Sequence, residues 1–255
     1  MTDQMHFFSW DERRDIAHPG NYEETILFSV EHFFNCAKEA QTLHGHFSVA
    51  LSGGSTPKAI FQALAKPPYA TEIDWGRVFL FWGDERSVAP TDPESNFRMA
   101  IESGFKNLAI PAEHIFRMEA EENLHENALK YEHKIKEVLG NRPFDLMMLG
   151  MGEDGHTASL FPGTNALEEE DRLVVANEVP QKKTWRMTLT FPIINKAKNI
   201  ALYVCGKSKN EMVSKVFLEN HAPPFPVSKI GTSMNKALWI LDTDASKNLL
   251  KARNH

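Results

Sequence analysis

The stretch GMGEDGHTASLFP, residues 150–162, follows an apolar run over residues 144–149 that predicts a buried parallel strand. Three glycines leave the backbone free to turn tightly and let a ligand come close. The turn carries a carboxylate and an imidazole, Asp154 and His156. Ligands of open α/β sheets bind just past the carboxyl ends of strands, so this pair is a candidate active site.

The rest of the chain alternates between apolar runs and amphipathic segments. Asn21 and Glu24 match the capping-box spacing at the start of the first predicted helix. The alternation predicts an α/β fold, with a mostly parallel sheet covered by helices on both faces. No repeat or linker is visible, so we expect residues 1–255 to form a single domain. Strands are expected at 47–51, 78–82, 144–149, 186–190, 200–205 and 237–241, and helices at 22–43, 57–65, 95–104, 124–138 and near 207–219.

Composition excludes several classes of protein. The net charge is −6 without a basic block, which argues against a nucleic-acid partner. No apolar run approaches the length of a membrane span, and the N-terminus has no apolar signal core, so we expect a cytoplasmic protein without a membrane partner. No metal motif is present, and His44 and His46 are expected at the surface. Cys205 lies in an apolar run and is expected to be an inert core thiol.

The loop LSGGSTP, residues 51–57, lies between a predicted strand and a predicted helix. Thr56 is expected to cap this helix and Pro57 to take its first position. Backbone N–H groups and small hydroxyls at a helix start bind phosphate well, although a plain strand–helix turn remains the alternative. The loop matches neither a Walker loop nor the dinucleotide fingerprint. The candidate phosphate-binding residues are Ser52, Gly53, Gly54, Ser55 and Thr56.

Further charged residues follow other predicted strands. Asp84, Glu85 and Arg86 leave the strand at 78–82 together. The planar fork of an arginine matches phosphate or carboxylate oxygens, but taken alone Arg86 is better explained by a surface ion pair. Arg186 and Lys209 are individually weak candidates that would complete a phosphate site if they converge on the loop at 51–57.

The histidine in the opening stretch can act chemically near neutral pH, since an ordinary imidazole has a pKa of about 6.5. Asp154 or Glu153 is expected to orient it. A hydrogen-bonded structural histidine is the alternative, but the glycines and the strand-end position favour chemistry. The Gly-x-Ser-x-Gly pattern is absent, so we expect no covalent serine mechanism.

Taken together, these motifs resemble the 6-phosphogluconolactonases, which share a superfamily with the glucosamine-6-phosphate deaminases. The order and spacing match across about residues 20–245. The matching segments are LSGGSTP at 51–57, WGDER at 82–86, SNFR at 95–98, LGMGEDGHTASLFPG at 149–163, WRMTLTFPIINKA at 185–197 and VCGKSK at 204–209.

The resemblance implies a Rossmann-like α/β fold and hydrolysis of 6-phospho-D-glucono-1,5-lactone in the oxidative pentose phosphate pathway. It implies no cofactor and no metal, a small phosphorylated lactone as the partner, and a monomer or homodimer. By the same resemblance, His156 is the general base and Asp154 its neighbour. The implied substrate contacts are Ser52, Gly53, Gly54, Ser55, Thr56, Asp84, Arg86, Arg186 and Lys209.

Two positions separate this chain from the deaminases that it resembles. Those enzymes carry a glutamate five residues after the histidine, where this chain has Phe161, and tend to carry a tyrosine where it has Arg86. Both differences favour the lactonase over a sugar-phosphate isomerase or deaminase. The other alternative, a non-catalytic sugar-phosphate sensor, could dispense with Asp154 and His156, which this chain keeps. The segment FPVSKIG, residues 225–231, departs from the lactonase pattern because it lacks a proline near Gly231, so the shape of that loop is left open.

Overall fold

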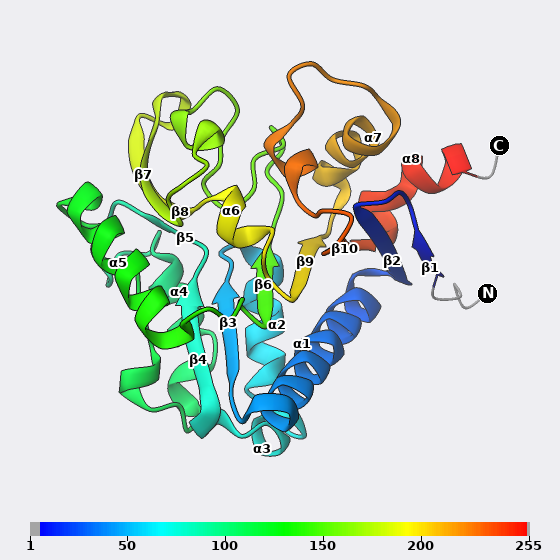
Figure 1. The fold of residues 1–255 in the computed structure, drawn as a ribbon. Helices are drawn as coiled ribbons and strands as arrows, with labels where there is room; N and C mark the ends of the chain where they lie inside the picture. The colour runs from blue at the N-terminus through cyan, green and yellow to red at the C-terminus, as the bar shows by residue number, and fades with distance from the viewer. Residues whose placement is uncertain (1–5, 254–255) are drawn as a thin grey trace.

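The computed structural model describes residues 6–253, which form a seven-stranded sheet and a smaller three-stranded sheet (Figure 1). The strands are β1 (His6–Ser9), β2 (Arg14–Gly20), β3 (Phe47–Leu51), β4 (Val78–Trp82), β5 (Asp84–Arg86), β6 (Leu146–Leu149), β7 (Val174–Val179), β8 (Thr184–Leu189), β9 (Asn199–Val204) and β10 (Ala237–Asp242). The helices are α1 (Tyr22–His44), α2 (Ser55–Leu64), α3 (Tyr69–Glu72), α4 (Asn96–Glu102), α5 (Leu124–Leu139), α6 (Phe191–Ile194), α7 (Asn210–Leu218) and α8 (Thr243–Arg253).

The large sheet has the order β1-β2-β10-β9-β6-β3-β4 and is parallel except for β1, which runs antiparallel to β2. The connections through α1, from β2 to β3, and through α2, from β3 to β4, both lead toward the β4 edge of the sheet. The connection through α5, from β4 to β6, leads back from that edge. Right-handed crossovers therefore place α1 and α2 on one face and α5 on the other. The expected α/β architecture with a mostly parallel sheet is confirmed.

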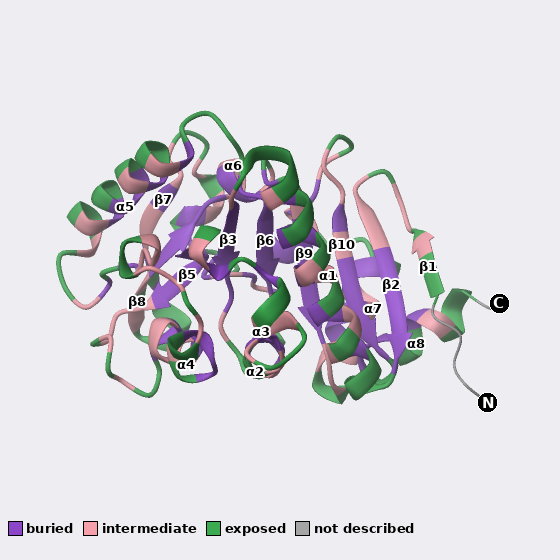
Figure 2. Ribbon diagram, turned by 90° about the horizontal axis from the view of Figure 1, so that it is seen from below, coloured by how far each residue is buried: buried purple, intermediate pink, exposed green. Residues whose placement is uncertain are grey.

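The strands that were predicted from continuous apolar runs form the core of this sheet. Every residue of β3 and β6 is buried, and Figure 2 shows these strands lying between helices whose outer faces are exposed. The predicted capping box of α1 is confirmed, since Asn21 Oδ1 accepts from the Glu24 N–H at 3.0 Å and the Glu24 carboxylate accepts from the Asn21 N–H at 2.8 Å.

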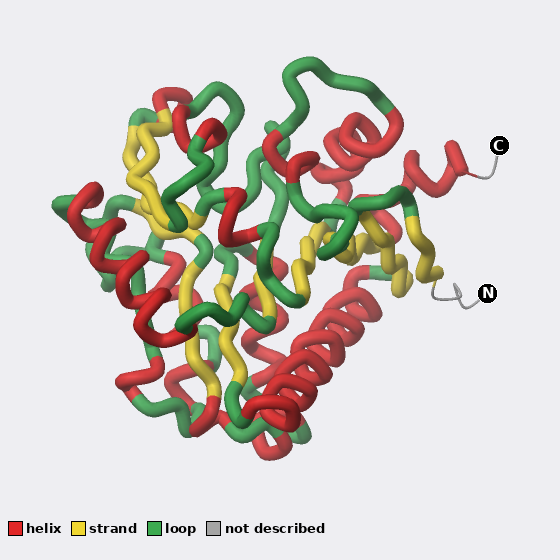
Figure 3. The backbone as a smooth tube through the Cα atoms, in the orientation of Figure 1, coloured by secondary structure: helices red, strands yellow, loops and turns green. Residues whose placement is uncertain are grey.

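The small sheet was not predicted. The strand expected at 186–190 is β8, which leaves the parallel sheet and pairs antiparallel with β5 and β7. Long loops gather above the upper ends of the central strands in the view of Figure 3. Because those strands are parallel, this is the end at which a ligand pocket is expected.

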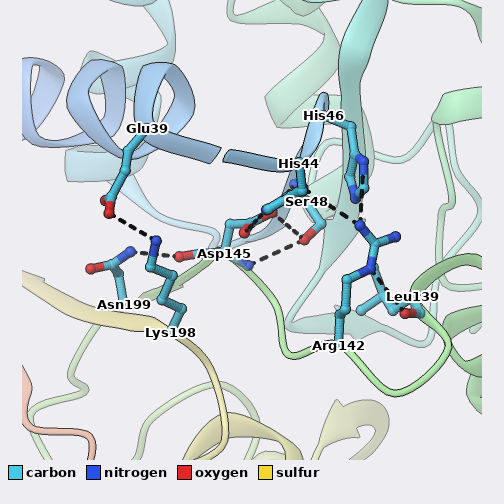
Figure 4. Close-up of polar contacts among 9 residues, drawn as sticks. All are labelled: Glu39, His44, His46, Ser48, Leu139, Arg142, Asp145, Lys198 and Asn199. Atoms are coloured by element: carbon cyan, nitrogen blue, oxygen red, sulfur yellow. Dashed lines mark hydrogen bonds and ion pairs between the residues drawn. The ribbon is translucent and has the colours of Figure 1, made fainter. Parts of the chain in front are cut away.

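The opposite end of the sheet is closed by a polar cluster around Asp145 (Figure 4). Its carboxylate accepts from the N–H and hydroxyl of Ser48 at 2.8 Å each, and lies 2.8 Å from His44 Nε2. Arg142 Nη1 lies 3.5 Å from Nδ1 of His44 and 3.4 Å from Nδ1 of His46. His44 is exposed and His46 half-buried, so the two histidines lie at the surface as expected, where His44 also links α1 to Asp145.

We expect this cluster to make stability depend on pH through His46. Burial lowers the pKa of His46, and the nearby Arg142 and His44 lower it further, while Asp145 opposes them. The unfolded chain therefore takes up this proton first, near the ordinary pKa of about 6.5. The free energy of unfolding should fall as pH drops below that value and level off once the folded imidazole is also protonated.

Urea unfolding at pH 7 and pH 5 tests this expectation. His46→Asn should lose less of its free energy of unfolding between the two pH values than the wild type does. Equal losses in the two proteins would contradict the role given to His46.

Candidate active site

A pocket of about 470 Å³ lies at the upper end of the sheet and brings together segments that are far apart in the chain. Its walls come from the loops after β3, β6 and β9 and from the paired strands β5 and β8. Asp154 does not line the pocket, but it contacts His156, which does. Of the predicted site residues, those that line the pocket are Ser52, Gly53, Gly54, Ser55, Thr56, Asp84, Arg86, His156, Arg186 and Lys209.

The turn after β6 closes on itself through the Gly152 N–H, which donates to the His156 carbonyl at 2.8 Å. The Gly155 N–H donates to the Gly152 carbonyl at 3.1 Å, and Gly155 has a φ of +77°. A Cβ atom at Gly152 would lie 2.1 Å from Nδ1 of His156 and 2.6 Å from Oδ1 of Asp154. A glycine at position 152 is therefore needed to make room for the histidine and aspartate side chains.

The His156 ring is held on two sides. Its Nδ1 lies 2.5 Å from Asp154 Oδ1, and its face stacks on Phe161 with ring centroids 4.0 Å apart. Burial by itself would raise the pKa of Asp154, but the hydrogen bond and charge of His156, together with backbone N–H groups, bring this pKa below its usual value. The ionised carboxylate favours a proton on Nδ1, which leaves Nε2 free to accept one.

Two arginines form a cationic wall of the pocket. Arg86 in β5 and Arg186 in β8 are directly paired in the small sheet. Among the described residues, the buried Nε atom of each has no hydrogen-bond partner. Burial, and then the charge of Arg86, lower the pKa of Arg186 from its usual value. An anion bound between the two side chains would supply the missing acceptors and offset the repulsion.

The two carboxylates beside Arg86 have supporting contacts that the sequence did not predict. Asp84 lines the pocket, but its carboxylate accepts from the Ser159 hydroxyl at 2.6 Å and lies 3.3 Å from Asn96 Nδ2. Glu85 accepts from the Ser95 hydroxyl and from two backbone N–H groups at the start of α4. These contacts fix β5 to α4 and to the loop after β6.

The loop after β3 differs from its predicted form at the helix start. Helix α2 begins at Ser55, Gly54 takes the cap position with a φ of +105°, and no side chain caps the helix. The prediction that Thr56 caps α2 and Pro57 takes its first position was wrong, because Gly54, with a positive φ, takes the cap position two residues earlier. Gly53 approaches α4 so closely that a Cβ there would lie 2.0 Å from Asn96 Oδ1.

Several residues on the pocket wall were not predicted or were placed elsewhere. Cys205, expected in the core, is partly exposed and lines the pocket. Burial raises the pKa of its thiol to about 12, so it is a poor nucleophile, as expected. Lys182, Asn96 and Tyr203 also line the pocket. Lys182 and Lys183 were weak candidates that would help to complete a phosphate site if they converged on the loop at 51–57, and of the two Lys182 lines the pocket.

Residues 6–253 contain no group of three or more histidine, cysteine, aspartate or glutamate side chains placed to hold a metal ion. Within the same range, no helix has the length and apolar character needed to cross a membrane.

Comparison with known proteins identifies relatives that cover most of the chain. The 6-phosphogluconolactonase of Chlamydia muridarum is 42% identical over 225 residues, which are 88% of this chain and 86% of that protein. The enzyme of the same name from Haemophilus influenzae is 39% identical over 204 residues, covering 79% of this chain and 87% of that protein. The structure of 6-phosphogluconolactonase from Trypanosoma cruzi superposes with a TM-score of 0.83 at 27% identity, covering 96% of this chain and 99% of that one.

A sequence model of the family described as glucosamine-6-phosphate isomerases/6-phosphogluconolactonase matches residues 21–239. Because this match spans most of the 255 residues, and because relatives above 30% identity cover more than two thirds of the chain, the protein belongs to the glucosamine-6-phosphate isomerase/6-phosphogluconolactonase family.

Proposed function

We propose that this protein hydrolyses 6-phospho-D-glucono-1,5-lactone to 6-phospho-D-gluconate in the oxidative pentose phosphate pathway, with His156 as the general base. The observation that carries the proposal is that one pocket combines a candidate general base with a candidate anion-binding site. It holds an imidazole whose Nδ1 is engaged by Asp154, and it holds two paired arginines whose buried Nε atoms lack acceptors among the described residues. The names of the relatives agree with this substrate.

The proposed reaction begins when neutral His156 accepts a proton from water at Nε2 while the water oxygen attacks C1 of the lactone. The resulting oxyanion is stabilised by a backbone N–H or a cationic side chain of the pocket. As this intermediate collapses, the bond between C1 and the ring oxygen breaks, and the proton on Nε2 passes to that oxygen. One proton is taken and one is returned, so the histidine ends the cycle neutral.

The phosphate lies several bonds from C1 and takes no part in this chemistry. Its proposed place is between Arg86 and Arg186, with the loop after β3 and Lys209 as further contacts. Binding there would hold the lactone against His156, so that energy from a remote group orients the reacting carbon.

Phe161 argues against the deaminase alternative. At the position where the resembling deaminases carry a glutamate, an apolar ring stacks on His156 and offers no titratable group. The single domain, the cytoplasmic location, and the monomeric or homodimeric state remain predictions.

A coupled assay tests the proposed function. Glucose-6-phosphate dehydrogenase generates the lactone in place, and 6-phosphogluconate dehydrogenase reports its hydrolysis. We expect the protein to accelerate product formation well above the spontaneous rate and to release no ammonia from glucosamine-6-phosphate. Ammonia release without lactone hydrolysis would support the deaminase instead.

Arg186→Ala should raise KM for the lactone about tenfold or more, because a hydrogen bond to a charged group contributes about 1.5–3 kcal/mol. The effect on kcat should be smaller, since the phosphate is distant from C1. Arg186→Lys keeps the charge but loses the planar fork and should give an intermediate KM. An unchanged KM in Arg186→Ala would remove this residue from the phosphate site.

A further inference from the structure

The turn that carries His156 is braced from outside by a distant segment of the chain. We propose that Phe225 is a positioning residue for the reaction, which acts by pressing on Gly155 and so holding the His156 imidazole in place. The effect on catalysis rests on the proposed function, whereas the bracing itself is a property of the fold.

Two contacts join the segment around Phe225 to the tip of the turn. The Val227 N–H donates to the Gly155 carbonyl at 3.0 Å. A Cβ atom at Gly155 would lie 2.8 Å from Cδ1 and 2.9 Å from Cβ of Phe225. The phenylalanine therefore packs directly on the Cα atom of Gly155, which is buried although Glu153 and Asp154 just before it are exposed.

The brace matters because the reacting side chains sit at the surface of the turn. Asp154 and His156 have side chains that are 41% and 26% exposed, so core packing on every side does not fix them. The turn is held internally by the backbone hydrogen bonds that the Gly152 and Gly155 N–H groups donate, and Phe161 supports one face of the imidazole. Contact with Phe225 and Val227 adds support from the side of Gly155.

The segment that braces the turn, residues 225–231, is itself fixed to the rest of the protein. Val227 and Ile230 are fully buried. Asn195, at the end of α6, accepts from the Gly231 N–H at 2.8 Å and donates to the Lys229 carbonyl at 3.1 Å. The segment that departs from the lactonase sequence pattern thus contains a short 3₁₀ helix, Pro226–Lys229. Its buried side chains and its hydrogen bonds to Asn195 hold it against the turn.

Space beside Phe225 explains why its removal should loosen the turn. Phe225 also borders a second pocket of about 350 Å³, in which the His221 ring lies with its centroid 4.5 Å from that of Phe225. Truncation to alanine would keep Cβ but remove Cγ and Cδ1, which also pack on Gly155. The turn would gain room to move without a clash that forces a new fold.

Phe225→Ala is expected to lower kcat about tenfold or more, since small displacements of a catalytic group are costly. KM should change by less than about twofold, because the arginines that are proposed to bind phosphate lie on the separate small sheet. Phe225→Leu should keep a kcat near that of the wild type, since leucine retains Cβ, Cγ and a Cδ atom, the atoms that pack on Gly155. Ser228→Ala, in the same segment, is the matched control and should resemble the wild type.

A second measurement does not depend on activity. The nitrogen NMR signals of the His156 imidazole should shift or broaden in Phe225→Ala and remain as in the wild type in Phe225→Leu and Ser228→Ala. If Phe225→Ala does not fold, Phe225→Val, which keeps Cβ but lacks the Cδ1 atom that packs on Gly155, tests the same contact and should lower kcat. Wild-type kcat and unchanged imidazole signals in folded Phe225→Ala would overturn the proposal. If the wild type itself fails to hydrolyse the lactone, the proposed function fails, and the imidazole signals still test the brace.

Discussion

His156→Ala is expected to lower kcat for lactone hydrolysis by about 10²- to 10⁴-fold, which is the usual loss when a general base is removed. KM should change little, because the proposed phosphate contacts lie on other elements of the pocket. The ring is anchored through Nδ1 on Asp154 and stacked on Phe161, so the single group lost to the reaction is Nε2.

Steady-state kinetics measure this effect once spontaneous hydrolysis is subtracted. His133→Ala removes an exposed histidine from α5, outside the pocket, and serves as the control. A kcat near that of the wild type in His156→Ala would exclude His156 as the base.

Gly152→Ala is expected to lower kcat about 10²-fold, although it adds only one methyl group. That methyl would lie 2.1 Å from His156 Nδ1 and 2.6 Å from Asp154 Oδ1, so at least one of the two side chains must move. A displacement of about 1 Å in a catalytic group can cost about this much.

Gly150→Ala is the matched control for this prediction, because a Cβ atom there would meet only Ser52 Oγ at 3.8 Å, an ordinary contact distance. It should lose far less activity than Gly152→Ala when kcat is compared for the two purified variants. Equal losses would mean that the space beside the imidazole does not matter.

The strands that carry the pocket could be predicted because their local pattern and their surroundings agree. Residues 78–82 are a continuous apolar run and residues 47–51 are apolar except for Ser48, and the structure forms β4 and β3 from them with the predicted bounds. The strand-end rule then placed the loops after β3 and β6 on one edge of the sheet. The convergence of Arg186 and Lys209 on the loop at 51–57, expected only as a condition, is present in the structure, and Arg86 lines the same pocket.

The small sheet could not be predicted because β5 lacks such a pattern, although β8 was expected as a strand. β5 is three residues long and consists of Asp84, Glu85 and Arg86, all charged. The carboxylates of Asp84 and Glu85 are satisfied by partners on other elements, Ser159 for Asp84 and the start of α4 for Glu85. Local sequence contains no trace of such tertiary contacts, so Asp84 was predicted only as a substrate contact.

The start of α2 shows a different limit of sequence-based prediction, namely that cap preferences alone do not locate the first residue of a helix. Thr56 and Pro57 have the residue preferences of a cap and a first helical position, yet Gly54 takes the cap position with a positive φ that favours glycine. Close approach of Gly53 to Asn96 accompanies this arrangement. The position of the loop therefore depends on packing against α4, which cap preferences do not describe.

The central claim is tested most directly by following the phosphorus NMR signals of the lactone and of 6-phosphogluconate in one sample, without coupling enzymes. The lactone signal is expected to disappear much faster with the wild type than without protein, and His156→Ala should lose most of this acceleration. Disappearance at the spontaneous rate in the presence of the folded wild type would contradict the claim.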